Sequence, residues 1–205
     1  LGYFNKNNNN EVTVLVATSG DTGAAVANGF LGVKNVKVVI LYPSGKVSAI
    51  QEKQLTTLGQ NISALEVKGT FDDCQAMVKT AFLDKKLTDM MQLTSANSIN
   101  VARWLPQLFY FMFAYKRLYK KHKDLVFSVP SGNFGNVCAG MIAQQLGLPI
   151  KHFIASNNDN NVVTKYLSTA LYKPKPSVQT ISNAMDVGDP SNFIRIQELY
   201  KNNLE

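Results

Sequence analysis

The sequence VTVLVATSGDTGAAVA, residues 12–27, joins an apolar run to a helix-forming run through a short polar loop. The run at residues 12–17 is apolar except for Thr13, which is typical of a parallel strand that is buried on both faces. Backbone N–H groups at the start of a following helix carry partial positive charge, and glycine lets such a loop close around an anion. We therefore expect the loop at residues 18–23 to bind an anionic group at the end of a buried strand.

The side chains of this loop support that hypothesis. An ordinary turn between a strand and a helix needs one or two hydrogen-bonding side chains. This loop has four: Thr18, Ser19, Asp21 and Thr22. The ordinary turn remains the alternative interpretation.

A second loop of the same kind has the sequence SGNFGN at residues 131–136. It follows the apolar run 125–129 and precedes the helix-forming run 137–143. Neither loop contains the glycine spacing of a P-loop or of a dinucleotide-binding fold. Two such loops indicate a ligand, or two ligands, with anionic groups.

Apolar runs alternate with helical patterns along the chain, as in proteins built from βαβ units. Strands are expected at residues 12–17, 36–41, 62–67, 125–129 and 150–155. Helices are expected at residues 22–31, 47–58, 71–84, 99–122, 136–146 and 160–169, with a last helix after residue 192. The fold class predicted is α/β, with parallel sheets in three layers and helices on both faces. The alternation breaks between residues 84 and 100, which predicts two sub-sheets.

A third polar cluster, TSANSINVAR at residues 94–103, stands at the start of the long predicted helix. If Asn97 and Ser98 occupy the helix cap, their side chains and the free N–H groups face one anion. Arg103 lies about a turn and a half further on and brings a bidentate guanidinium to the same side. The cluster predicts a phosphate site, and a capped amphipathic helix with a surface arginine is the alternative.

Composition excludes several classes of function. The chain has 205 residues and a formal net charge of +7, but its most basic stretch, residues 116–123, is expected to end a helix, and no nucleic-acid recognition motif accompanies it. Cys74 and Cys138 are expected to be buried free thiols, without a disulfide or a zinc site, as in a reducing cytoplasm. The apolar segment 104–115 is too short to span a membrane and contains Pro106. The aromatic residues of the same segment are expected to fill the core: Phe109, Phe111, Phe113 and Tyr115.

Several segments, in order, together resemble the threonine synthase family of bacteria and fungi, within the fold type II pyridoxal-phosphate enzymes related to tryptophan synthase β. The segments are residues 17–25, 42–48, 95–103, 130–136 and 182–187, and the resemblance extends from about Val12 to Ile196. It implies a lyase of threonine biosynthesis that uses pyridoxal 5′-phosphate (PLP) to convert O-phosphohomoserine and water to threonine and phosphate.

The resemblance also implies roles for the residues of the three clusters. The cofactor phosphate would be held by the N–H groups of five residues: Gly132, Asn133, Phe134, Gly135 and Asn136. Asp21 would face the cofactor O3′, with Thr18, Ser19 and Thr22 near the substrate carboxylate. Asn97, Ser98 and Arg103 would bind the substrate phosphate.

In this family the Schiff-base lysine lies upstream of the 18–23 loop in a Phe-Lys-Asp type motif, and only Lys6 precedes the loop here, in an asparagine-rich stretch. We therefore expect a central piece of a larger enzyme that is inactive by itself. Residues 1–122 are expected to form a small-domain-like βα unit with the substrate loops. Residues 123–205 are expected to belong to the large PLP-binding domain. Open sheet edges would permit self-association.

Two alternatives remain open at this point. One is another fold type II lyase, such as a serine or threonine dehydratase or a cysteine synthase, although those relatives do not need a phosphate cluster like that at residues 97–103. The other is a non-catalytic module that binds a phosphorylated metabolite.

Overall fold

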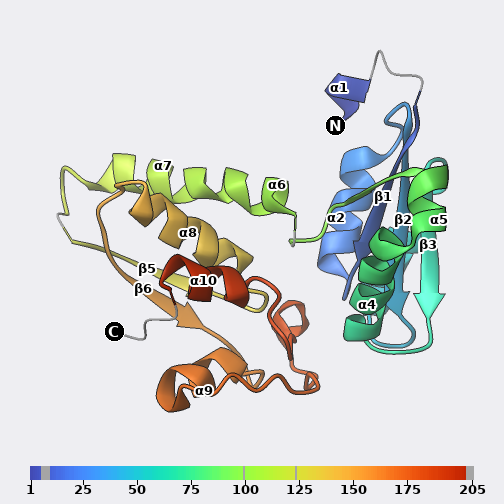
Figure 1. The fold of residues 1–205 in the computed structure, drawn as a ribbon. Coiled ribbons are helices and arrows are strands. Elements are labelled where there is room, and N and C mark those ends of the chain that lie inside the picture. Colours follow the sequence, from blue (N-terminus) through green and yellow to red (C-terminus); the bar gives the residue numbers. More distant parts are fainter. Residues whose placement is uncertain (6–9, 99, 123, 202–205) are drawn as a thin grey trace. The chain divides into compact units, whose positions relative to one another are not determined.

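The computed structural model describes residues 1–5, 10–98, 100–122 and 124–201. The chain forms two compact units, Leu1–Asn97 and Ser98–Glu205 (Figure 1). The boundary therefore lies before the segment 98–122, which the sequence analysis had assigned to the first unit. The segment belongs to the second unit because its helical residues, such as Trp104 and Phe111, pack on the helix at Gly135–Gln145.

The first unit contains a four-stranded parallel sheet. Its strands are β1 (Val12–Ala17), β2 (Val36–Pro43), β3 (Ile62–Val67) and β4 (Gln92–Ser95), in the order β3-β2-β1-β4. In the centre of the sheet, Val14 lies opposite Val38 on one side and Thr94 on the other. Three of these strands were predicted, but β4 was not. It is short and polar, and it pairs only with β1 among the described residues.

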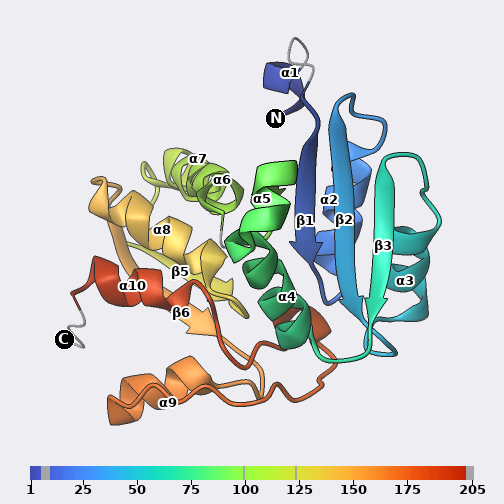
Figure 2. The same ribbon diagram turned by 45° about the vertical axis from the view of Figure 1, so that its right-hand side comes forward.

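Helices cover both faces of this sheet, as predicted (Figure 2). Helices α2 (Asp21–Phe30) and α3 (Ala49–Thr56) pack on one face, where Val26 and Leu55 meet the buried side chains of β1 and β2. Helices α4 (Phe71–Leu83) and α5 (Lys85–Met90) lie on the other, where Cys74 and Val78 pack against Leu15. The ends of β1 and β2 are thereby fixed by packing on both sides. A single helical turn, α1 (Gly2–Asn5), precedes the sheet.

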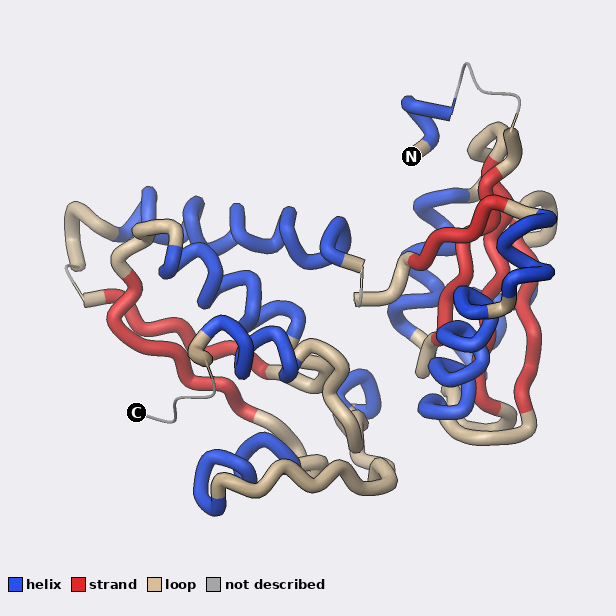
Figure 3. The backbone as a smooth tube through the Cα atoms, viewed as in Figure 1, coloured by secondary structure: helices blue, strands red, loops and turns tan. Residues whose placement is uncertain are grey.

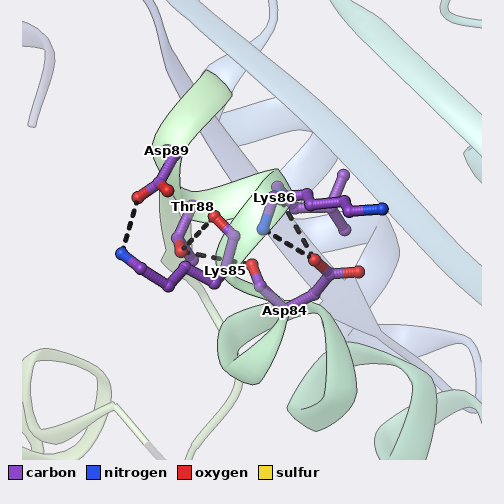
Figure 4. Close-up of polar contacts among 6 residues, drawn as sticks. Asp84, Lys85, Lys86, Thr88 and Asp89 are labelled. Carbon is purple, nitrogen blue, oxygen red and sulfur yellow. Dashed lines mark hydrogen bonds and ion pairs between the residues drawn. The ribbon is translucent and has the colours of Figure 1, made fainter.

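Polar caps start several of these helices. Ser48 begins α3 with a reciprocal capping box to Gln51. Helix α5 was not predicted, and its cap is Asp84, whose Oδ1 accepts hydrogen bonds from the backbone N–H groups of Lys86 at 2.9 Å and Leu87 at 3.3 Å (Figure 4). An aspartate before Lys85 and Lys86 is a helix-start signal that the sequence analysis missed.

The second unit contains a two-stranded parallel sheet of β5 (Leu125–Pro130) and β6 (Ile150–Ser156). Helices α8 (Gly135–Gln145) and α9 (Val162–Thr169) follow these strands, and α10 (Phe193–Leu199) comes after a long loop (Figure 3). The second sheet confirms the predicted division into sub-sheets. The single helix predicted at 99–122 is wrong, because Pro106 has no N–H to donate. Instead α6 (Val101–Trp104), a 3₁₀ turn (Leu105–Gln107) and α7 (Leu108–Leu118) follow one another, and residue 99 lies outside the described residues.

Aromatic rings form the core of this unit. Phe111 of α7 contacts Phe127 and Phe153 edge to face, with ring centroids 5.1 and 5.9 Å apart. The expectation that the aromatic residues of this segment fill the core is thus confirmed for Phe111, which is 7% exposed. It is wrong for Phe109 and Phe113, which are 55% and 62% exposed. They lie two residues to either side of Phe111, and on a helix such neighbours face away from the buried stripe.

The two cysteines lie on helices α4 and α8 as buried free thiols, as predicted. Within the described ranges, no helix combines the length and the apolar character needed to cross a membrane.

Candidate functional site

The 18–23 loop of the first unit is shaped by Thr18. This side chain is 1% exposed, and its Oγ1 accepts hydrogen bonds from the backbone N–H groups of Gly20 at 2.9 Å and Gly23 at 2.8 Å. Gly20 has a φ of +136°, a conformation in which a side chain would be strained. Thr18 therefore folds the loop back over the start of α2.

The other polar side chains of the loop are more open. Ser19 and Thr22 are half-buried, and Asp21 is exposed at the first position of α2. Asp21 Oδ1 accepts a hydrogen bond from Gln51 Nε2 at 2.6 Å. This contact fixes the carboxylate against α3 and leaves its second oxygen for another donor.

Asn97 lies at the end of β4 and binds the backbone of β1. Its Oδ1 accepts from Ala17 N at 2.9 Å, and its Nδ2 donates to Ala17 O at 2.5 Å. The Asn97 side chain thus continues the pairing of β1 and β4 beyond Leu15 and Ser95, where the backbone ladder ends. The expectation that Asn97 caps the next helix is wrong, because Asn100 is the N-cap of α6 and accepts from Ala102 N at 3.0 Å.

The 131–136 loop of the second unit presents a row of free backbone donors. Among the described residues, no acceptor is found for the N–H groups of five consecutive residues, Gly132, Asn133, Phe134, Gly135 and Asn136. Phe134 has a φ of +61°, which is uncommon for a bulky residue. Its ring is buried and packs edge to face on Phe193, with centroids 5.9 Å apart. Core packing thus holds the loop in a conformation suited to an anion.

The segment 182–187 forms the support behind this loop. A Cβ atom at Gly132 would lie 2.6 Å from Met185 Cα, so only glycine fits at this close approach. Asp186 anchors the segment: it accepts hydrogen bonds from Asn158 Nδ2 at 2.8 Å, Asn160 Nδ2 at 3.1 Å and the Thr180 hydroxyl at 2.6 Å. The segment 182–187 therefore packs against Gly132 and fixes its position.

A cluster of four polar residues joins two of the predicted motifs. Asn133 Nδ2 donates to Ser98 Oγ at 2.7 Å, and Asn192 Nδ2 donates to the same oxygen at 3.1 Å. Arg195 Nη1 in turn donates to Asn192 Oδ1 at 2.7 Å. We call Ser98, Asn133, Asn192 and Arg195 the Ser98 cluster. Sequence reasoning identified the first two and missed Asn192 and Arg195, which precede and begin an unremarkable amphipathic helix.

Arg103 lies on α6, where it is half-buried, and burial lowers the pKa of its guanidinium. Arginine remains charged at neutral pH even so. Burial also raises the pKa of the Cys138 thiol on α8, and the nearby positive charge of Arg195 opposes this shift. Arg195 therefore brings a cation to the same part of the second unit as the 131–136 loop.

Each unit by itself contains some of the site residues that the sequence predicts. In the first unit, Thr18, Ser19, Asp21, Thr22 and Asn97 surround the carboxyl end of β1, where ligands bind in α/β folds. In the second, Ser98 joins the loop that follows β5. That loop fits a phosphate group, since its five free N–H groups meet no carboxylate among the described contacts.

Comparison with known proteins agrees with this geometry. A family model described as "Pyridoxal-phosphate dependent enzyme" matches residues 2–204. The chain is 54% identical over 202 residues to threonine synthase of Buchnera aphidicola subsp. Baizongia pistaciae, covering 98% of this chain and 47% of that protein.

Solved structures give the same result. The crystal structure of threonine synthase from Escherichia coli superposes with a TM-score of 0.89 at 50% identity, covering 94% of this chain and 45% of that one. PLP-bound threonine synthase from Brucella melitensis superposes with a TM-score of 0.83 at 38% identity, covering 99% and 44%. The chain thus spans about half the length of these relatives. These matches confirm the predicted resemblance and fold class, and the chain belongs to the family of pyridoxal-phosphate dependent enzymes.

Proposed function

We propose that the protein carrying this chain is a threonine synthase, which converts O-phosphohomoserine and water to threonine and phosphate with PLP as cofactor. The observation that carries the proposal is the identity of 54% to a threonine synthase across 98% of the chain. The polar clusters that the two units contain fit the anionic groups of this cofactor and substrate.

The cofactor phosphate is assigned to the 131–136 loop. Five free N–H groups at the start of α8 would donate to its oxygens, from Gly132, Asn133, Phe134, Gly135 and Asn136. The helix dipole adds to the attraction. When bound, PLP supplies the electron sink for carbanion chemistry on the substrate. The protein's task here is to hold that group by its phosphate end.

The substrate side is assigned to the end of β1 and to α6. Ser19 and Thr22 are half-buried at the 18–23 loop and are our candidates for contact with the substrate carboxylate. Thr18 and Asn97 would act through the backbone that they hold, because their described hydrogen bonds are to protein atoms. Asp21 would place its second carboxylate oxygen toward the cofactor O3′, and Arg103 would bind the substrate phosphate.

Each unit would carry part of these contacts, with Ser98 and Arg103 now placed in the second unit. Leu1–Asn97 would carry the carboxylate and O3′ contacts, and Ser98–Glu205 would carry both phosphate contacts. We also propose a cytosolic location, which the two buried free thiols support. The edge of β3, which pairs only with β2 among the described strands, supports self-association.

The test is turnover by the full-length gene product. With PLP present, we expect it to release phosphate from O-phosphohomoserine and to form threonine in equal amounts. Serine, threonine and O-acetylserine would distinguish the other fold type II lyases, and binding without turnover of any substrate would indicate a non-catalytic module. Release of ammonia from threonine without phosphate release from O-phosphohomoserine would contradict the proposal.

A further inference from the structure

The hydroxyl group of Ser98 receives two hydrogen bonds from amide groups. Asn133 Nδ2 lies 2.7 Å from Ser98 Oγ, and Asn192 Nδ2 lies 3.1 Å from it. An amide nitrogen donates and does not accept, so Ser98 must be the acceptor in both contacts if the two amides are oriented as described.

The orientation of both amides is fixed by donors that cannot accept. Asn133 Oδ1 lies 2.6 Å from the backbone nitrogen of Ser191, which carries an N–H. Asn192 Oδ1 lies 2.7 Å from Arg195 Nη1, and a guanidinium has only donors. Rotating either amide by 180° would place a donor against a donor. The Nδ2 atoms of both residues therefore face Ser98.

The Ser98 hydroxyl can then act toward a ligand only as a hydrogen-bond donor. Two accepted hydrogen bonds use both lone pairs of Oγ, and only the proton remains. No acceptor for that proton lies among the described residues, and the side chain is half-buried. Ser98 Cβ is 3.6 Å from the position of a Cβ on Gly135, at the first turn of α8. The available donor thus stands beside the loop with five free N–H groups.

Asn192 is well suited to impose this arrangement. It is completely buried, and Phe193 beside it packs on Phe134 of the loop. Arg195 is half-buried and sets the amide of Asn192 with one charged hydrogen bond. Asn192 and Arg195 can therefore orient the Ser98 hydroxyl toward a ligand without contacting that ligand themselves.

We propose that Asn192 and Arg195 are positioning residues that hold the Ser98 hydroxyl as a hydrogen-bond donor to a phosphate oxygen. The inference rests on the proposed function, in which the cofactor and the substrate both carry a phosphate. Either phosphate has the required chemistry, and the experiment distinguishes them.

The first variants are Asn192→Asp and Ser98→Ala. Aspartate keeps an acceptor for Arg195 but presents an oxygen to Ser98, so the hydroxyl would turn to donate to residue 192. Both changes remove the same donor from the phosphate. We expect each to weaken phosphate binding roughly 10- to 100-fold, and the double variant to lose much less than the product of the two. Asn161→Asp, which adds the same charge beside Lys175, is the matched control.

Two ligand arms identify the phosphate. In the cofactor arm, calorimetry on the 205-residue chain compares pyridoxamine 5′-phosphate with pyridoxamine, which lacks the phosphate. In the substrate arm, the full-length gene product loaded with PLP is inhibited with inorganic phosphate. An effect confined to one arm assigns Ser98 to that phosphate. Arg195→Met should reproduce the loss and Arg195→Lys should restore binding, because lysine also donates to Asn192.

Amide NMR spectra establish that each variant is folded. Unchanged affinity of Ser98→Ala in both arms would overturn the inference, and so would fully additive losses in the double variant, because additivity means that Asn192 acts through charge or packing. If the wild-type chain itself did not prefer pyridoxamine 5′-phosphate to pyridoxamine, the assignment of the cofactor phosphate to the 131–136 loop would fail together with this inference.

Discussion

Replacing Asn97 by alanine should unpair the end of β1. The side chain is 9% exposed and supplies both the acceptor for Ala17 N and the donor to Ala17 O. Ala17 is itself 1% exposed, so water does not readily replace these bonds. An unsatisfied buried backbone group costs about 1–3 kcal/mol. For two groups at the end of an edge-strand pairing we take the lower half of this range, which gives a loss of about 2–4 kcal/mol of local stability.

Hydrogen exchange at the Ala17 amide measures this loss directly. The exchange rate should rise roughly 30- to 700-fold at constant pH, because each 1.4 kcal/mol corresponds to about a factor of ten. Asn28→Ala, which removes one exposed hydrogen bond to Ala24 O within α2, should leave the Ala17 rate unchanged. If Asn97→Ala also left it unchanged, Asn97 would not hold β1, and its amide would be available for direct contact with a ligand.

Three further predictions follow from the packing and the charges. Gly132→Ala should weaken binding of pyridoxamine 5′-phosphate by about tenfold or more, because the methyl group meets the Met185 backbone. Gly29→Ala is the control, because a Cβ there meets no other atom. Equal affinities of Gly132→Ala and the wild type would contradict the close approach of Gly132 to Met185. Asp186→Asn should destabilise the second unit by about 2–4 kcal/mol in urea unfolding, since the new amide N–H group then faces the donors of Asn158 and Thr180. Asp124→Asn, at an exposed ion pair with Lys151, is the control and should cost less than about 0.5 kcal/mol. Burial raises the pKa of the Cys74 thiol from 9.0 to about 11, so the native state binds more protons than the unfolded state in that interval, and stability should fall as pH rises from about 9 to 11. The stability of Cys74→Ala should fall less steeply with pH over this interval. Identical pH slopes for the variant and the wild type would refute the assignment of this pH dependence to Cys74.

The fold could be predicted well where the sequence carries local signals. Apolar runs located five strands to within two residues, although β3 and β6 also contain polar residues such as Ser63 and Lys151. The signal is clearest in β1, where all six residues are buried. Strand β4 gave no such signal, since it lies at the sheet edge and is stabilised by pairing with β1. The broken helix around Pro106 was missed because the apolar pattern continues through the proline.

The site was only partly predictable, for a different physical reason. The free N–H groups of the 131–136 loop follow from glycine spacing before a helix, which is a local pattern. Ala17 lies 80 positions from Asn97, and Asn133 and Asn192 lie 35 and 94 positions from Ser98. A single sequence gives no measure of such proximity. Asn97 and Thr18 were recognised as functional candidates from their polarity. The Thr18 hydroxyl, however, accepts from backbone N–H groups, and the shortest hydrogen bonds of the Asn97 amide are to the Ala17 backbone.

The central claim is that the 131–136 loop of this chain holds the phosphate of PLP through its backbone. The direct measurement is an amide NMR titration of the chain with pyridoxamine 5′-phosphate, which has no aldehyde and so cannot react with lysines. We predict shifts at the amides of Gly132, Asn133, Phe134, Gly135 and Asn136 that pyridoxamine does not produce. If these amides stayed in place, or moved equally with pyridoxamine, the loop would not be the phosphate site.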